Sequence, residues 1–460
     1  MPTQCISNSH EFEALDGRKV VAAFDGGAIT SDAGALLLRH TDKAIGLFDR
    51  LAACFDDRRN GDCTVHGVRT LIAQRVTAIA LGYEDVDDHD TLRHDPVLGL
   101  VSQSLTSKRS NCAPLAGKST LNRLEHGTAG EPTRYHRISH DRGAIEDLFV
   151  ALFLEAHAAP PRQIVLDLDA TDDPLHGHQE GRFFHGYYGC YCYLPLYIFC
   201  GRHLLCARLR RSNIDASKGA ERDIERIVMQ IRKAWPRVRI ILRADSGFAR
   251  NTLMDWCEAN KVDFIFGLAR NQRLERKIEP ALEEACLACQ ARGEPARMFR
   301  DFMWSTKDSW SRRRRVIGKA EWTLKGANPR FIVTSLKSDH WGARALYEDL
   351  YCARGEMENR IKECQLDLYA DRTSAHTMRA NQLRLWFASF AYVLICALRR
   401  LGLKHTRLAN ATSGTIRLKL LKIGAQVRIS VRRIKVAMAS AYPYRHEFTV
   451  AHARIRAAAR

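Results

Sequence analysis

The sequence has 460 residues, of which 46% are hydrophobic. This length exceeds the roughly 250–300 residues over which a single hydrophobic core grows, so two or three domains are expected. The hydrophobic share argues against wholesale disorder. Lys and Arg number 71 and Asp and Glu number 52, and the resulting formal net charge of +19 indicates a polyanionic partner.

Residues 1–160 show mostly helical patterns, and we interpret them as a DNA-binding region. From residue 164 the pattern changes, because short apolar segments at 164–166, 193–199 and 203–208 predict strands. Gly201 predicts the turn of a hairpin between the last two. A helix over 215–235, a strand over 238–242, a helix over 250–260 and a strand over 262–268 are expected next. A hairpin attached to parallel strands with crossover helices predicts a mixed α/β sheet.

The remaining chain divides into three further regions. Residues 271–342 begin with a charged helix and continue with strand-like segments, so they are interpreted as a β-rich insertion after the first part of the core, 161–270. Helical character over 343–403 predicts the second part of the core. Residues 404–460 form a basic region, with strand-like pieces at 415–420 and 426–434 and a final helix.

The basic C-terminal stretch favours nucleic acid over membrane as the partner. Between Asp371 and the C-terminus the only acidic residue is Glu447, and the Lys and Arg residues run through several segments instead of one amphipathic helix. The longest apolar run, 385–398, is shorter than the about 20 residues that span a bilayer, so a buried core helix is expected. A polar N-terminus and 14 scattered cysteines indicate a cytoplasmic protein, and nucleic acid as the partner makes it nucleoid-associated.

Carboxylates stand at the ends of two predicted strands. Asp167 and Asp169 end the first strand and, being two residues apart, project from the same face, while Asp245 ends the fourth strand. Neighbouring strands of an open α/β sheet bring such residues together at their carboxyl ends. Close carboxylates repel one another, and a divalent cation relieves that repulsion. Hard oxygen ligands suit Mg²⁺ or Mn²⁺.

A later helix presents a polar face. Tyr351, Arg354, Glu358, Lys362 and Gln365 recur at spacings of three and four, which places them on one side of the helix. This face suits a site that holds a metal and a phosphate. The residues alone leave open the alternative of a solvated face with ordinary ion pairs.

The chain resembles the DDE transposases of bacterial insertion sequences, whose catalytic core is RNase H-like. Asp169-Ala170-Thr171 matches their Asp-x-Thr pattern, and Asp245 follows a hydrophobic strand as their second Asp does. One branch carries Tyr, two residues, Arg, three residues, Glu, six residues, Lys, together with a β-rich insertion. Tyr351, Arg354 and Glu358 match, whereas Gln365 replaces the Lys, so Lys362 is the expected substitute. Residues 167–188 are most similar to the thirteen-eighty family.

The resemblance implies a transposase that cuts DNA at the ends of its element and transfers the freed 3′-hydroxyl into target DNA. Two Mg²⁺ (or Mn²⁺) ions are expected on Asp169, Asp245 and Glu358, with Asp169 shared between them. The implied partners are double-stranded DNA, namely terminal inverted repeats and target, and a second copy in a homodimer; no membrane partner is expected. The expected phosphate-binding residues are Tyr351, Arg354, Lys362, Arg312, Arg313, Arg314 and Arg315.

Three alternatives remain open at this point. The first is an RNase H-like nuclease that hydrolyses DNA without joining strands, because its active site would be the same. The second is a non-catalytic DNA-binding derivative. The third is a zinc protein that uses His176 and His178 with the nearby Cys190 and Cys192.

Overall fold

The computed structural model describes residues 9–107, 109–127, 130 and 133–459. They divide into two compact units. Unit 2 is Asp141–Ser389, and unit 1 combines Met1–His140 with Phe390–Arg460. The N-terminal and C-terminal regions, predicted as separate, therefore belong to one unit. The five-region division and its DNA-binding assignment stay predictions.

Unit 2 is built on a mixed sheet, in which a hairpin is attached to parallel strands as predicted. Its first five strands run β11-β10-β6-β12-β13 across the sheet. The first strand along the chain pairs antiparallel with the hairpin and parallel with β12, which in turn is parallel to β13. The bounds are β6 Gln163–Ala170, β10 Leu196–Cys200, β11 His203–Arg208, β12 Arg239–Ala244 and β13 Asp263–Leu268. The α/β, RNase H-like fold class is thereby confirmed.

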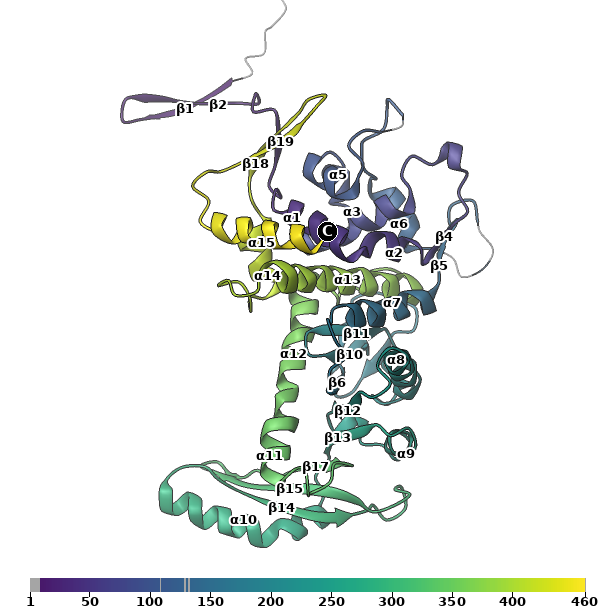
Figure 1. Ribbon diagram of the computed structural model, residues 1–460, viewed down its shortest axis with the longest axis vertical. Helices are drawn as coiled ribbons and strands as arrows, with labels where there is room; N and C mark the ends of the chain where they lie inside the picture. The colour runs from purple at the N-terminus through teal and green to yellow at the C-terminus, as the bar shows by residue number, and fades with distance from the viewer. Residues whose placement is uncertain (1–8, 108, 128–129, 131–132, 460) are drawn as a thin grey trace, which may run out of the picture. The chain divides into compact units, whose positions relative to one another are not determined.

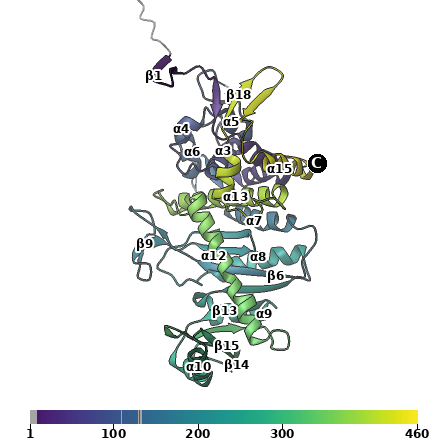
Figure 2. The same ribbon diagram turned by 90° about the vertical axis from the view of Figure 1, so that its left-hand side faces the viewer.

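Helices cover both faces of this sheet. α8 (Ala220–Ala234) buries Ile224, Ile227 and Ile231 on one side, as their spacing predicts. α7 (Arg142–Glu155) and α9 (Asn251–Ala259) are the other helices of the core. Figures 1 and 2 show α8 and α9 on one face of the sheet and α12 running across the other.

The segment predicted as a β-rich insertion continues the same sheet. β17 (Arg330–Thr334) pairs antiparallel with β13, and β15 (Arg314–Thr323) and β14 (Ala296–Trp304) extend the sheet outward. β16 (Gly326–Ala327) pairs with β15, and the sheet has nine strands in all. α10 (Gln272–Arg292) precedes these strands. These strands agree with the strand-like character predicted for 271–342, but they form no sheet of their own.

A long helical stretch crosses the sheet after β17. It contains α11 (Ala343–Ala345), the turn η4 (Cys352–Arg354) and α12 (Gly355–Lys362). Two π-helical segments, η3 (Leu346–Tyr351) and η5 (Glu363–Asp367), flank α12. π-helical turns inside helices frequently occur at functional sites. α13 (Met378–Gly402) is long and apolar enough to cross a membrane, but 78% of its apolar window is buried inside the protein, as predicted for a core helix.

Unit 1 joins both ends of the chain through a small sheet. β3 (Ala28–Thr30) pairs with β18 (Ala425–Ile429), which pairs with β19 (Ile434–Met438). Two further ribbons are β1 (Ser9–Leu15) with β2 (Arg18–Ala23) and β4 (Phe55–Asp57) with β5 (Ile138–His140). The helices are α1 Ala35–Ile45, α2 Leu47–Ala52, α3 Val68–Leu81, α4 His89–Leu92, α5 Pro96–Ser102, α6 Lys118–Glu125, α14 Ser413–Ile416 and α15 Arg445–Ala458. A short turn, η1 (Gly61–Cys63), and a π-helical segment, η6 (Arg417–Leu421), complete the unit.

Candidate active site

Two aspartates leave adjacent strands at the same level. β6 and β12 are parallel, with Ala244 opposite Leu168. The residues that come next, Asp245 and Asp169, therefore lie side by side at the end of the strands. Asp245 caps the turn η2 (Ser246–Phe248), where its Oδ1 accepts a hydrogen bond from the Gly247 N–H at 2.9 Å.

The second aspartate of β6 has a different environment. Asp167 lies opposite Arg243 and forms a buried ion pair with it, with Oδ1 2.5 Å from Nε and Oδ2 2.8 Å from Nη2. Arg243 also donates from Nη1 to the carbonyl oxygen of Leu350 at 2.5 Å. Both oxygens of Asp167 are therefore engaged in a structural contact. Asp169, whose side chain lines a pocket, has no such partner on the neighbouring strand.

The helical stretch adds the third carboxylate and a guanidinium. Arg354 donates to Glu358 Oε1 at 2.7 Å and to Asp169 Oδ2 at 3.4 Å, so its guanidinium lies between two carboxylates. Burial raises the pKa of Asp169 to about 7; Arg354 lowers it, and the nearby carboxylates of Asp245 and Glu358 raise it. The three carboxylates thus act on one another, and Arg354 supplies the compensating charge.

These groups share one cavity of about 450 Å³. Three carboxylates, two cations and several polar and aromatic side chains line it. The lining residues are Asp169, Ala170, Thr171, His185, Tyr187, Tyr188, Leu194, Ala216, Asp245, Arg354, Glu358, Ile361, Lys362 and Gln365. Asp169, Asp245, Arg354, Glu358 and Lys362 are therefore brought together as the sequence predicts.

Tyr351 approaches the site from behind the turn that carries Asp245. A Cβ added to Gly267 on β13 would lie 2.6 Å from the Tyr351 hydroxyl and 2.9 Å from the backbone nitrogen of Ser246. Only glycine leaves room for this approach. Burial raises the pKa of Tyr351, so its hydroxyl stays protonated.

The position expected to hold a lysine has a structural contact instead. Gln365 donates to the carbonyl oxygen of Asp172 at 3.1 Å and to Asp173 Oδ1 at 3.0 Å. Asp173 is fully buried, and burial raises its pKa well above the usual value. Gln365 thus ties the helix to the loop after β6. The exposed Lys362 is the cation that lines the cavity here.

Sequence reasoning missed the aromatic wall of this cavity. It comes from a small sheet in which β7 (Asp173–Pro174) and β8 (Phe183–His185) pair with β9 (Cys190–Tyr193). Tyr187 and Tyr188 lie in the turn between β8 and β9, and Tyr187 is 87% exposed. The signal was the Tyr pair between Gly186 and Gly189, because glycines on both sides of two aromatic residues are typical of an exposed turn.

The family is shown by a match over almost the whole chain. The family described as "Transposase DDE domain group 1" matches residues 12–460. The chain belongs to this family of transposases. It is also similar to a solved piggyBac transposase synaptic complex with hairpin DNA, at 11% identity and a TM-score of 0.42, over 85% of this chain and 80% of that one. No curated protein matches it.

Two members of the arginine run that was expected to bind phosphate are buried in this transposase. Arg314 is buried and pairs with Asp255 at 2.6 Å and Glu258 at 2.8 Å. Arg315 is buried and pairs with Asp301 at 2.6 Å. Arg314 thus ties β15 to α9, and Arg315 ties β15 to β14, so their expected phosphate role is corrected. Arg312, paired with Glu258 at 3.3 Å, and Arg313 remain exposed.

The zinc alternative gains no support from the transposase structure. Within the described ranges, no three His, Cys, Asp or Glu side chains are grouped so that they could hold a metal ion. His176 and His178 are exposed and do not line the cavity. The same finding applies to the three carboxylates, between which the Arg354 guanidinium is placed. A metal would therefore require Arg354 to move.

Proposed function

We propose that the chain is an insertion-sequence transposase that cuts DNA at the ends of its element and transfers the 3′-hydroxyl into target DNA. The proposal depends on one observation above all: Asp169, Asp245 and Glu358, from β6, the end of β12 and α12, line one cavity in a DDE transposase. We also propose membership of the thirteen-eighty family, on the likeness of residues 167–188. Double-stranded DNA, a homodimer and a cytoplasmic, nucleoid-associated location belong to the same proposal.

The donor set fits hard divalent cations. All three side chains offer carboxylate oxygens, which Mg²⁺ and Mn²⁺ prefer. Burial raises the pKa of Asp169, the carboxylates of Asp245 and Glu358 raise it further, and a bound cation would relieve that repulsion. Asp169, Asp245 and Glu358 would hold two ions, which when bound stabilise the attacking and leaving oxygens of an in-line phosphoryl transfer.

The remaining side chains of the site bind and orient DNA. Arg354 offers a planar fork that suits a phosphate, once it is released from Glu358 and Asp169. The exposed ammonium of Lys362 adds a second cation at the cavity wall. Tyr351 supports the Asp245 turn from Gly267 and contributes its hydroxyl to phosphate binding. Arg312 and Arg313 stay proposed as outer contacts to the DNA backbone.

The test is cleavage of DNA that carries an element end, with and without Mg²⁺. Asp169→Asn, Asp245→Asn and Glu358→Gln are each expected to lower the cleavage rate more than about 100-fold, because loss of a direct metal ligand exceeds the effect of losing its supporting group. DNA binding, measured by fluorescence anisotropy, should change little. Chelation of Mg²⁺ should reproduce the loss in the unmodified protein.

Glu356→Gln is the matched control. Glu356 lies on the same helix, is exposed and does not line the cavity, so this variant should cleave at the normal rate. If Glu358→Gln kept full cleavage activity and Glu356→Gln lost it, the third metal-binding carboxylate would be Glu356, and the assignment of Glu358 would be overturned.

Strand transfer distinguishes this proposal from its alternatives. Pre-cut element ends incubated with plasmid and Mg²⁺ should become joined to it. Cutting without joining would identify a nuclease, and binding without cutting would identify a non-catalytic derivative. Short inverted repeats bracketed by a direct duplication in the flanking DNA would support the transposase independently.

A further inference from the structure

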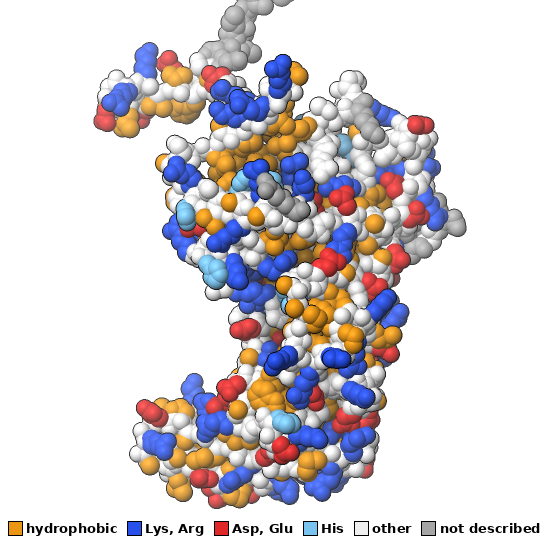
Figure 3. All heavy atoms as spheres, in the orientation of Figure 1, with side chains coloured by type: hydrophobic (Ala, Val, Ile, Leu, Met, Phe, Trp, Pro, Cys, Tyr) orange, Lys and Arg blue, Asp and Glu red, His pale blue; other side chains and the backbone are white. Residues whose placement is uncertain are grey.

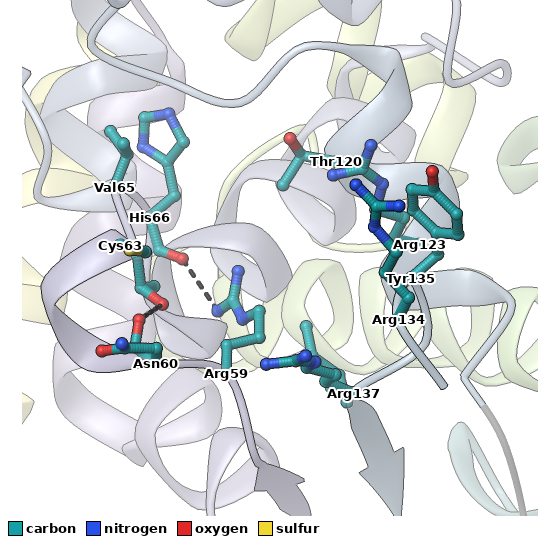
Figure 4. A pocket seen from close by; sticks show the side chains of 12 residues that line it. Arg59, Asn60, Cys63, Val65, His66, Thr120, Arg123, Arg134, Tyr135 and Arg137 are labelled. Atoms are coloured by element: carbon teal, nitrogen blue, oxygen red, sulfur yellow. Dashed lines mark hydrogen bonds between the residues drawn. The ribbon is translucent and has the colours of Figure 1, made fainter. Parts of the chain in front are cut away.

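A second cavity, of about 470 Å³, lies wholly within unit 1 and is rich in arginine. Arg59 follows β4, Arg123 is on α6, and Arg134 and Arg137 precede β5. Figure 4 shows these side chains around the cavity, with Arg123 and Arg134 beside Tyr135. The other lining residues are Asn60, Cys63, Thr64, Val65, His66, Thr120, Tyr135 and Ile138, so no carboxylate of the described residues lines it.

Among the residues that the structure describes, three of the four guanidiniums have no acidic partner. Arg59 pairs with Asp57 at 2.7 Å, whereas Arg123, Arg134 and Arg137 form no ion pair with any residue that the structure describes. Other arginines of unit 1 do pair, as Arg69 does with Asp49 at 2.7 Å. Like charges gathered around one cavity repel one another unless an anion enters. The cavity is therefore complementary to negative charge.

Tyr135 holds two of these arginines in place without neutralising them. The guanidinium carbon of Arg123 lies 5.6 Å from the ring centroid, and that of Arg134 lies 5.5 Å from it. A cation–π contact orients a guanidinium while its charge and its N–H donors remain available. A carboxylate at this place would orient the arginines and cancel their charge. Tyr135 thus acts as a positioning residue for an anion site.

Neutral donors complete the lining. The Thr120 hydroxyl and the Asn60 side chain face the same cavity, and His66 Nδ1 is a buried atom without a hydrogen-bond partner among the described residues. Guanidinium forks together with hydroxyl and amide donors are the groups that contact phosphate oxygens in protein–DNA interfaces.

We propose that this cavity is a second DNA site of the transposase, which binds phosphate groups of the DNA backbone through Arg59, Arg123, Arg134 and Arg137. The proposal rests on DNA being the substrate, but its residues are entirely separate from those of the carboxylate cavity. It assigns to this site the positioning of DNA, since phosphate contacts fix the register of a protein on a duplex.

The test is to measure the binding of a DNA duplex to the full-length protein by fluorescence anisotropy at several salt concentrations. Each neutralised phosphate contributes about 0.9 to the slope of log K against log salt concentration. Arg123→Ala combined with Arg137→Ala should lower that slope by about two and weaken binding at least about tenfold at low salt. Arg123→Lys with Arg137→Lys should restore most of the slope, because the charge is kept.

Tyr135 and Arg58 provide the matched comparisons. Tyr135→Phe should bind as the unmodified protein does, because the ring that holds both guanidiniums is retained, whereas Tyr135→Ala should weaken binding. Arg58 precedes Arg59 but pairs with Asp56 at 2.6 Å and does not line the cavity. Arg58→Ala should therefore leave the slope unchanged.

Two results would overturn the proposal. An unchanged slope in the double alanine variant, with an unchanged thermal melt, would show that these arginines do not meet phosphates. Displacement of DNA by millimolar inorganic phosphate at constant ionic strength would assign the cavity to a small anion instead. Asp245→Asn serves to separate the two sites, because it should abolish cleavage and keep the salt slope; a failure of the proposed catalysis would leave this binding result intact.

Discussion

At the scale of single residues, what faces a carboxylate decides its role. Asp167 and Asp169 project from the same side of β6, yet Asp167 meets Arg243 on the neighbouring strand and Asp169 meets the cavity. Burial raises the pKa of Asp167 although Arg243 lowers it. The attraction between Asp167 and Arg243 therefore offsets only part of the free-energy cost of burying the Asp167 charge. Removing either partner alone would leave the other as a buried charge without a counterion.

Asp167→Asn is expected to destabilise unit 2. The amide leaves the buried Arg243 guanidinium without a counterion, and losing one partner of a buried pair costs about 3–5 kcal/mol. Asp169→Asn should cost much less, since Asp169 shares Arg354 with Glu358 and is repelled by two neighbouring carboxylates. The measurement is urea denaturation at neutral pH in the presence of a chelator. Equal losses of unfolding free energy in the two variants would contradict this assignment.

The sequence predicted which residue types gather here, but not which of them pair. Two aspartates two residues apart share a face, so the strand pattern could not separate Asp167 from Asp169. Arg243 is the residue that separates them, and its place opposite Asp167 depends on the register of two strands more than seventy residues apart. The burial of Arg314 and Arg315 was missed because their acidic partners lie on other elements, Asp255 on α9 and Asp301 on β14, whose placement the local pattern does not give.

At the scale of elements, the close approach of β13 to the helical stretch sets the position of Asp245. Gly267 lies on β13 beside both Tyr351 and the Asp245 turn, and a Cβ there would also meet the Asp245 carbonyl carbon at 3.1 Å. Backbone atoms of the turn cannot move aside without moving Asp245. The site therefore depends on a residue that carries no functional group.

Gly267→Ala is expected to lower the cleavage rate at least about tenfold while DNA binding changes little. A displacement on the scale of 1 Å near a reacting centre is enough for losses of this kind or larger. Adding Tyr351→Phe removes the nearest atom and should recover part of the stability lost, as a double-mutant cycle would show. Gly342→Ala is the control, because nothing lies within 4 Å of its added Cβ. Normal cleavage by Gly267→Ala would contradict the argument.

Elements with strong local signals were predictable, and those set by distant partners were not. Short apolar runs identified the five core strands, and the spacing of Ile224, Ile227 and Ile231 identified α8. The strand expected over 415–420 is wrong: α14 and η6 are helical there, burying Ile416 and Leu420 four residues apart. Apolar and basic residues alternate over 415–420, and this pattern is typical of a strand, which explains the wrong prediction. The π-helical segments that flank α12 had no signal in the sequence.

At the scale of the whole molecule, the excess positive charge is shared out over two compact units. Figure 3 shows Lys and Arg side chains gathered over the C-terminal hairpin β18–β19 and the helix α15 that follows it. The arginine cavity comes from residues 59–138 of the same unit. The excess of Lys and Arg in the composition predicted a polyanionic partner. The joining of both ends of the chain in one unit depends on the pairing of β3 with β18, which no local pattern encodes.

The core of unit 1 should respond to acid through one buried histidine. His89 is completely buried, and its Nδ1 lies 2.9 Å from Gln74 Nε2. Burial, with a smaller contribution from Arg75, lowers the pKa of His89 to about 3. In the unfolded chain the pKa returns to about 6.5. Below about pH 6.5, His89 binds a proton in the unfolded state but not in the folded state. The free energy of unfolding therefore decreases as the pH falls from about 6.5 toward 3.

The expected loss of unfolding free energy depends on how far the pH lies below the histidine pKa of the unfolded chain. At pH 5 the unfolded chain is about 1.5 pH units below its histidine pKa, which corresponds to about 2 kcal/mol of lost stability. His89→Gln removes the titrating group while keeping an acceptor for Gln74. Urea denaturation of both proteins at pH 7 and pH 5 isolates the effect, because Asp42, whose pKa burial raises to about 6, titrates in both. Parallel losses in the two proteins would show that His89 is not the group that destabilises unit 1 in acid.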